Sequence, residues 1–200
     1  MTQKSTVRSP IVAAALACSA IAAGAQTAVP TAPAAEPPLP LTANITVATK
    51  YKFRGQDQGN TRWASPAVQG GFDWTQNGFY LGNWNSNVNF SNAAIEMDFY
   101  GGYRGEIVKD FGYDLGLLYY YYPQQNRIVD FDTLELYGAL SWQFLTFKYS
   151  HTVSKDYFGI GEIKEVSGAT GKVKGRNTGY FEVNANVLLA DKLTLNGHVG

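Results

Sequence analysis

From residue 41 onward, apolar side chains recur at every second position, in segments longer than ordinary strands. In 41–53 the odd positions are mainly apolar, whereas the even positions are mainly polar and end in Lys50, Lys52 and Arg54. A period of two predicts a strand with one apolar and one polar face. This segment exceeds the usual strand of about 5–6 residues but suits a tilted membrane strand of roughly 9–11. Strand length is therefore the first indication of a membrane protein.

The alternation continues to the last residue and predicts an all-β chain with about nine antiparallel strands and no helical spacing. The predicted strands are 41–53, 68–75, 80–90, 95–104, 113–122, 133–140, 145–150, 180–187 and a last one from Leu193. Connections are short near Gln76, Lys109, Trp142 and Asp191, and longer after Phe53, Tyr122 and Val153. Short turns on one rim and longer loops on the other are typical of an up-and-down transmembrane β-barrel with its short turns in the periplasm.

The two faces of the predicted strands differ in polarity. An interior enclosed by about nine or more strands is too wide for side chains to fill, which disfavours a soluble barrel with its apolar face inside. We therefore expect the apolar face to meet lipid, with strand-end aromatic girdles formed by Tyr51, Phe53, Trp74, Tyr80, Phe90, Tyr103, Tyr113 and Tyr121. In 80–90 we assign Tyr80, Trp84, Val88 and Phe90 to the lipid face and Asn83, Asn85, Asn87 and Asn89 to the polar face. The alternative is that the aromatic residues form the core of a soluble β-sandwich.

The polar face carries the residues that we expect to line the interior. They are Lys50, Lys52, Arg54, Asp73, Glu96, Asp98, Arg104, Asp114, Glu135, Lys148 and Glu182. Their charges are nearly balanced, so they could line a water-filled path or pair with one another and close it. We expect a bore narrowed by Tyr100, Tyr120, Tyr122, Tyr137 and Tyr180. For the glycine-rich connection 154–177 we favour a surface role over an inward constriction.

The first 40 residues have the pattern of an export signal and a spacer. Lys4 and Arg8 precede an uncharged, alanine-rich run from Ile11 that ends in Ala23-Gly24-Ala25, which predicts a cleaved signal peptide over 1–25. The run is shorter than the about 20 residues of a membrane-spanning helix. Lipidation at Cys18, the only cysteine, is the other alternative, but the position three places before it is alanine. A Pro/Ala-rich spacer then covers 26–40, and the barrel domain covers 41–200.

Composition narrows the range of functions. The formal net charge is zero, and charged residues make up 16% of the chain, against about 25% in ordinary soluble domains, so we expect no nucleic-acid partner. The two histidines, His151 and His198, are far apart in the sequence. Asp73, Glu96 and Asp98 could form a carboxylate cluster, but ion pairing in the interior explains them equally well. We therefore expect no catalytic residues, no cofactor and no metal site.

Several motifs, in this order along the chain, resemble a known family. They are YKFRG at 51–55, PAVQGGFDW at 66–74, GFYLGNWNSNV at 78–88, IEMDFYGGYRGE at 95–106, YYYP at 120–123 and DYFG at 156–159. Together they are similar to the TorF-type porins of proteobacteria. This resemblance implies an outer-membrane β-barrel with a transport role, and it carries no catalytic residues over to this chain.

The last residues depart from the expected pattern. The sequence stops at His198-Val199-Gly200, inside its last predicted strand and without a terminal aromatic residue. Because bacterial barrels have an even number of strands, we expect about 10–12 strands in the complete protein and interpret this chain as truncated.

These features together predict a porin-like channel in the outer membrane of a Gram-negative bacterium, for passive diffusion of small solutes. The expected partners are outer-membrane lipid, the barrel-assembly machinery and small solutes. The alternatives are a non-conducting structural or adhesive barrel and an outer-membrane enzyme.

Overall fold

A computed structural model describes residues 40–59, 66–90, 93–123, 129–160 and 175–200. All of these residues belong to one compact unit of the chain. The predicted signal peptide lies outside the described residues, as does the predicted spacer except for Pro40. The described residues contain no helix that is both long enough and apolar enough to cross a membrane.

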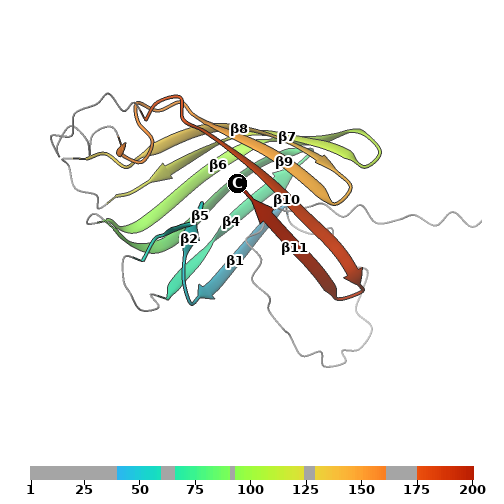
Figure 1. The fold of residues 1–200 in the computed structure, drawn as a ribbon, viewed down its shortest axis with the longest axis horizontal. Helices are drawn as coiled ribbons and strands as arrows, with labels where there is room; N and C mark the ends of the chain where they lie inside the picture. The colour runs from blue at the N-terminus through green and yellow to red at the C-terminus, as the bar shows by residue number, and fades with distance from the viewer. Residues whose placement is uncertain (1–39, 60–65, 91–92, 124–128, 161–174) are drawn as a thin grey trace, which may run out of the picture. The chain divides into compact units, whose positions relative to one another are not determined.

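The described residues form one sheet of nine strands and a small separate hairpin (Figure 1). In their order across the sheet, the nine strands are β1 (Leu41–Ala48), β4 (Ala67–Gln76), β5 (Phe79–Phe90), β6 (Ala93–Val108), β7 (Phe111–Tyr121), β8 (Thr133–Trp142), β9 (Leu145–Thr152), β10 (Gly179–Ala190) and β11 (Leu193–Val199). Each strand pairs antiparallel with the next, which confirms the predicted all-β, up-and-down antiparallel arrangement. Strands β1 and β11 are the two edges, so the sheet is not closed into a barrel.

Short turns join the strands in pairs at one end of the sheet. The chain reverses at Asn77-Gly78, where both residues have positive φ values, 51° and 86°. A two-residue turn with two positive φ values matches the right-handed twist of the strands that it joins. Asp110 and Gln143 also have positive φ values in the turns after β6 and β8. The predicted short turns are therefore confirmed, and the longer connections lie at the opposite end.

The prediction of one continuous strand over 41–53 is wrong. Strand β1 ends at Ala48, and the chain then forms a hairpin in which β2 (Lys52–Phe53) pairs with β3 (Gln56–Asp57). Arg54 and Gly55 form the tip, with φ values of 45° and 79°. The hairpin has the same two-residue alternation as the strand before it, so the pattern does not reveal that the chain leaves the sheet.

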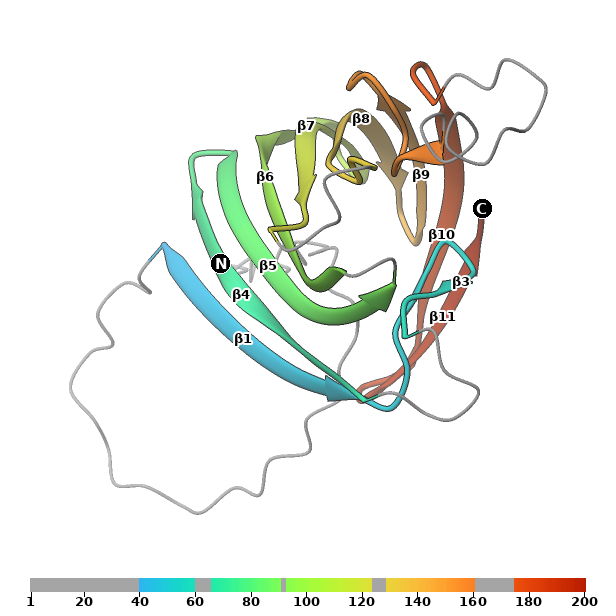
Figure 2. The ribbon, with the colours of Figure 1, turned by 90° about the vertical axis from the view of Figure 1, so that its left-hand side faces the viewer.

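This hairpin packs on one face of the sheet, which we call the inner face. The ring of Tyr51 packs edge-on against Trp84, and the ring of Phe53 packs edge-on against Tyr120. Figure 2 shows the sheet curving around this face, with the hairpin on its inner side. Tyr51 and Phe53 were predicted to point toward lipid, and the structure places both on the inner side instead.

The face assignment predicted for β5 is also wrong. Residues paired directly across an antiparallel sheet lie on the same face. Trp84 pairs with Asp98, whereas Asn83 pairs with Phe99. Trp84 therefore faces inward, together with Tyr80 and Val88, and Asn83, Asn85 and Asn87 lie on the outer face. The side chain of Phe90 lies outside the described part of the chain.

The asparagines on the outer face use neighbouring groups as hydrogen-bond partners. The amide of Asn85 donates to Oδ1 of Asn83 at 2.6 Å, and the amide of Asn83 donates to the carbonyl oxygen of Asp98 at 3.1 Å. Asn87 accepts from the backbone amide of Val68 at 2.6 Å. These contacts reduce the cost of placing polar side chains on an otherwise apolar face.

The inner and outer faces have the reverse of the polarity of a water-soluble protein. On the outer face Ile45, Leu81 and Leu115 are 80%, 62% and 59% exposed. On the inner face Glu135 is 1% exposed and Thr133 is fully buried. Acidic side chains are almost never fully buried in soluble proteins unless they are paired. The sheet therefore buries its polar face and exposes its apolar face.

Candidate functional site

The inner face gathers most of the residues predicted to line an interior. Nine of the eleven lie there: Arg54 from the hairpin, and Asp73, Glu96, Asp98, Arg104, Asp114, Glu135, Lys148 and Glu182 from the sheet. Lys50 and Lys52 do not, because they precede or begin the hairpin and their side chains are exposed. Lys50 instead forms an ion pair with Asp57 at 2.6 Å.

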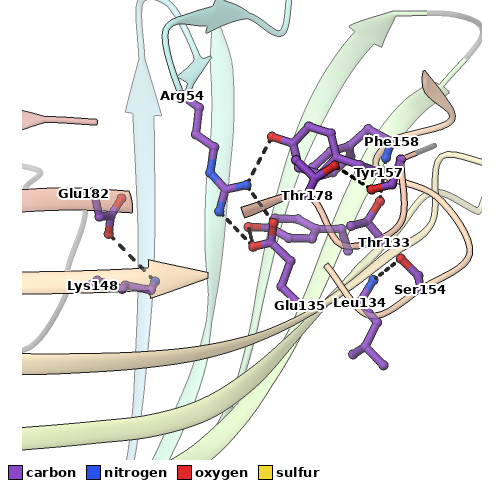
Figure 3. A network of polar contacts seen from close by, with 12 residues as sticks. Arg54, Thr133, Leu134, Glu135, Lys148, Ser154, Tyr157, Phe158, Thr178 and Glu182 are labelled. Carbon is purple, nitrogen blue, oxygen red and sulfur yellow. Dashed lines mark hydrogen bonds and ion pairs between the residues drawn. The ribbon is translucent and has the colours of Figure 1, made fainter. Parts of the chain in front are cut away.

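An ion pair between Arg54 and Glu135 fixes the tip of the hairpin to β8. The guanidinium donates from Nη1 to Oε1 at 2.7 Å and from Nη2 to Oε2 at 2.8 Å (Figure 3). Two parallel charge-assisted hydrogen bonds of this kind are strong and directional. The two side chains are only 10% and 2% exposed. Removal of either partner would leave a buried, unpaired charge, whose desolvation would strongly destabilise the folded state.

Aromatic rings surround the guanidinium of Arg54. Its Cζ lies 4.2 Å from the ring centroid of Tyr180 and 4.8 Å from that of Phe53. Nη1 also donates to the hydroxyl of Tyr157 at 3.2 Å. Burial lowers the pKa of the Arg54 guanidinium, but the hydrogen bond to Glu135 and the neighbouring groups outweigh it and raise that pKa. Arg54 therefore stays cationic at this position.

Glu96 on β6 is the second anchor of the hairpin. Tyr51 donates to its Oε1 at 2.7 Å, and Tyr122 donates to its Oε2 at 2.5 Å. Burial, followed by the neighbouring charge of Glu96, raises the pKa of both phenols. Both hydroxyls therefore remain protonated donors, and the carboxylate of Glu96 has a partner on each oxygen.

An aromatic cluster covers the inner face at the end with the longer connections. The ring of Phe158, which follows β9, lies 4.9 Å from Tyr120 and 5.7 Å from Phe53 between centroids. Tyr122 and Phe131 are buried in the same cluster. For 157–158 the structure thus shows the inward alternative rather than the favoured surface role, while 161–174 lie outside the described residues.

Asp98 differs from the other carboxylates of the inner face. It is 7% exposed, and its Oδ1 is buried without a hydrogen-bond partner among the described residues. In the sheet it pairs with Trp84 on one side and Tyr120 on the other. Asp98 is therefore a buried carboxylate with uncompensated acceptor capacity.

Nearer the short turns, tyrosines and carboxylates form a network across five of the nine strands. Tyr100 on β6 donates to Asp73 on β4 at 2.5 Å. Tyr80 on β5 donates to Asp114 on β7 and shares a hydrogen bond with the hydroxyl of Tyr137 on β8. These contacts link five adjacent strands through their inner side chains.

The basic residues of this region face the same network. The guanidinium of Arg104 lies 4.9 Å from the ring centroid of Tyr80, and Nζ of Lys148 lies 4.5 Å from that of Tyr137. Lys148 is also 3.9 Å from Glu182, which pairs with it across β9 and β10. This part of the inner face is therefore filled with paired polar side chains.

Sequence reasoning missed Tyr80 and Trp84 as inner residues, although a signal for them was present. Phe79 and Leu81 are apolar on the opposite phase of β5 and are 58% and 62% exposed. Gly82, on the same phase as Tyr80, gives the ring of Tyr100 room to lie against the backbone. Gly82 is a small residue between the large Tyr80 and Trp84 on the same phase of the strand. This pattern indicates a face on which large side chains from neighbouring strands are crowded together.

The histidines lie on different faces of the sheet. His151 is on the outer face of β9, where Nδ1 is 3.0 Å from the hydroxyl of Tyr149. His198 is on β11, where Nδ1 is 2.7 Å from Oδ1 of Asn184. Among the described residues, no group of three His, Cys, Asp or Glu side chains is placed to hold a metal ion.

Comparison with known proteins gives one result, which covers most of the chain. No curated protein and no solved structure matches it. A family model described as a bacterial protein of unknown function, Gcw_chp, matches residues 32–200. This chain, with its antiparallel sheet and polar inner face, therefore belongs to the Gcw_chp family of bacterial proteins.

Proposed function

We propose that this chain is an outer-membrane β-barrel protein whose polar inner face lines a narrow, porin-like path for small solutes. The observation that carries the proposal is the reversed polarity of the sheet, which exposes residues such as Ile45 and Leu81 and buries charged residues such as Glu135. In water, each large apolar side chain left exposed forgoes about 1.5–3 kcal/mol of burial free energy. In lipid, the same exposure is favourable.

Strand length supports the same environment. β5 and β10 each have 12 residues and β7 has 11, close to the roughly 9–11 of a tilted strand that crosses a bilayer. A chain that crosses lipid with strands must pair every backbone amide and carbonyl, which requires a closed sheet. The proposal therefore requires the edges β1 and β11 to be paired in the membrane.

The strand directions limit how the sheet would close. β1 and β11 run in the same direction, because the strands between them alternate in direction. Antiparallel closure thus needs an odd number of additional strands. We propose a complete barrel of about 10–12 strands, in keeping with the even counts of bacterial barrels. The short turns would lie in the periplasm and the longer connections outside the cell.

This proposal includes export by the predicted signal peptide and delivery to the barrel-assembly machinery. It is also in keeping with the resemblance to TorF-type porins. The path would lie along the tyrosine and carboxylate side chains of the inner face, with the hairpin at its outer end. Only small solutes would pass, because Arg54 and Tyr51 hold the hairpin against β8 and β6.

A second candidate function is a non-conducting structural or adhesive barrel. It is favoured by the dense pairing of the inner face, where the Tyr80, Asp114 and Tyr137 side chains are joined to one another. Such a network could fill the interior of a small barrel and leave no continuous water path. An enzyme is not part of either proposal.

The membrane proposal is tested by refolding the complete protein, with the additional strands that close the sheet, in detergent and in lipid vesicles. A folded barrel should migrate differently on SDS gels before and after boiling, and should fractionate with the outer membrane in cells. Recovery in the soluble periplasmic fraction, with no shift on boiling, would contradict it.

The channel is tested by conductance of the folded protein in planar bilayers and by swelling of vesicles in solutes of increasing size. Discrete conductance steps, with swelling limited to the smallest solutes, are expected. A protein that shifts on boiling but never conducts would reject the channel and favour the structural barrel.

A further inference from the structure

The inner face has an excess of negative charge that the sequence did not reveal. Among the predicted interior residues that the structure places there, three are cationic, Arg54, Arg104 and Lys148, and six are carboxylates. The near balance expected from the sequence included Lys50 and Lys52, whose side chains are exposed outside the main sheet. Glu106, on the inner phase of β6 beside its turn, adds a further carboxylate.

The carboxylates of the inner face differ in the cationic and hydrogen-bonding partners that stabilise their negative charge. Glu135 and Glu182 have cationic partners in Arg54 and Lys148. Glu96 accepts hydrogen bonds from two phenols, and Asp73 and Asp114 each accept one. In the described part of the chain, Oδ1 of Asp98 accepts none.

Asp98 also lies where negative charge is concentrated. Glu96 is two residues before it on the same face of β6, and Glu135 lies on the same inner face, on β8. Of these three carboxylates, Glu135 has a cationic partner, which is the guanidinium of Arg54. A small cation is the ligand that this arrangement favours, because it would compensate Asp98 without displacing an existing partner.

We propose that Asp98, together with Glu96 and Glu135, makes the interior selective for small inorganic cations over anions. This inference rests on the proposed channel function and names the class of solute that the channel prefers. Acidic rings in known pores select cations because they attract counter-ions and repel ions of the same sign.

The side chains around Asp98 fit weak rather than tight cation binding. No group of three acidic, histidine or cysteine side chains among the described residues is placed to chelate a metal ion. Conduction requires that an ion bind well enough to enter and weakly enough to leave. A carboxylate with one unpaired oxygen between aromatic neighbours meets that condition.

The test is the reversal potential of the full protein in a planar bilayer with a KCl gradient. The wild-type current should reverse at a potential of the sign that indicates K⁺ permeation. Asp98→Asn should lower the K⁺ to Cl⁻ permeability ratio by about two- to threefold or more, because it removes one unit charge from the interior. Asp98→Glu, which keeps the charge, should restore most of the preference.

Asp191→Asn is the matched control, because it makes the same chemical change at an exposed residue in the turn between β10 and β11. Its permeability ratio should equal that of the wild type. Each variant is first checked for the gel shift on boiling, and the wild-type reversal potential tests selectivity even where a variant does not fold.

The outcomes separate the two proposals. A folded protein with no conductance rejects the channel and this inference with it. Conductance without cation preference, or with anion preference, overturns the inference and leaves the channel in place. A cation preference that Asp98→Asn leaves unchanged overturns the role of Asp98.

Discussion

Arg54 and Glu135 lie 81 positions apart in the chain, yet the guanidinium binds both carboxylate oxygens, at 2.7 and 2.8 Å. The pair joins the tip of the β2–β3 hairpin to the centre of the sheet. Both side chains are almost fully buried, and the pair is one of the two polar anchors, with Tyr51 and Glu96, that hold the hairpin on the inner face.

The first prediction concerns the stability that this pair provides. Arg54→Ala and Glu135→Ala should each lower the free energy of unfolding by about 3–5 kcal/mol, because each leaves a buried charge without its partner. The double variant should cost less than the sum of the two. Urea unfolding of the refolded protein in vesicles measures all three. Strictly additive effects would contradict a direct coupling.

Lys50→Ala is the control for this series. It removes a cation from the same segment, but its ion pair with Asp57 is exposed. Lys50 lowers the pKa of Asp57 mainly through their hydrogen bond, and the contribution of this pair is present at neutral pH and lost as the pH falls through that lowered pKa. Because exposed ion pairs contribute little, Lys50→Ala should lower the free energy of unfolding at neutral pH far less than Arg54→Ala. In bilayers, the double variant Arg54→Ala/Glu135→Ala should conduct more than the wild type, whereas Lys50→Ala should not.

The second prediction concerns the close approach of Tyr100 to Gly82. A Cβ at Gly82 would lie 2.2 Å from Cε2 of Tyr100, so Gly82→Ala must displace the ring and weaken its hydrogen bond to Asp73. A loss of about 1–3 kcal/mol in unfolding free energy is expected from overpacking. Gly197→Ala on β11 is the control, because its nearest neighbour would be at an ordinary 3.8 Å. Equal stability of the two variants would contradict the packing of Tyr100.

The third prediction distinguishes a lipid-facing surface from a water-facing one. Leu117, on the outer face in the middle of β7, is 46% exposed. Leu117→Arg should lower unfolding free energy in vesicles by about 2–4 kcal/mol if this position lies near the bilayer midplane. Leu193→Arg, beside the turn into β11, should cost only about 0–1 kcal/mol. A soluble protein would instead tolerate both changes or become more soluble.

The fourth prediction concerns alkaline pH. The folded-state pKa of Tyr51 is raised above its ordinary value of 10.0 by burial and by Glu96. A phenol with a raised pKa contributes stability below pH 10.0 that is lost as the pH rises from there toward the folded-state pKa. Tyr51→Phe should therefore lower stability at neutral pH, by about 1.5–3 kcal/mol for a hydrogen bond to a charged group, and reduce the further loss at alkaline pH.

Unfolding measured at neutral pH and above pH 10 checks this prediction. Tyr149→Phe is the control, because its hydroxyl contacts His151 on the exposed outer face. If the free energy of unfolding falls by the same amount at alkaline pH in the wild type and in Tyr51→Phe, the Tyr51 phenol does not contribute to that loss of stability.

Much of the fold could be predicted because a period of two is a local property of a strand. Ile95 and Phe99 alternate with Glu96 and Asp98, and the structure places the first pair outside and the second pair inside. The turn at Asn77-Gly78 could be predicted for the same reason, since the backbone conformation of a tight turn depends on its own residues.

The face of β5 could not be predicted in the same way. Both of its phases carry large and polar side chains, so alternation alone predicts the wrong side for Tyr80 and Trp84. The pairing of Trp84 with Asp98 and of Asn83 with Phe99 settles the question. A shift of one residue in register moves every side chain to the opposite face, and the register depends on the neighbouring strand.

The sequence alone determined that this chain forms long antiparallel strands with one apolar and one charged face, because side-chain alternation follows from backbone geometry. Only the tertiary structure decided that 52–57 leaves the sheet as a hairpin and that Arg54 meets Glu135. It also decided that Lys50 and Lys52 are excluded from the inner face, which leaves that face acidic. Contacts between residues distant in the chain depend on how the sheet curves and on which strands face each other, and local alternation carries no information about either.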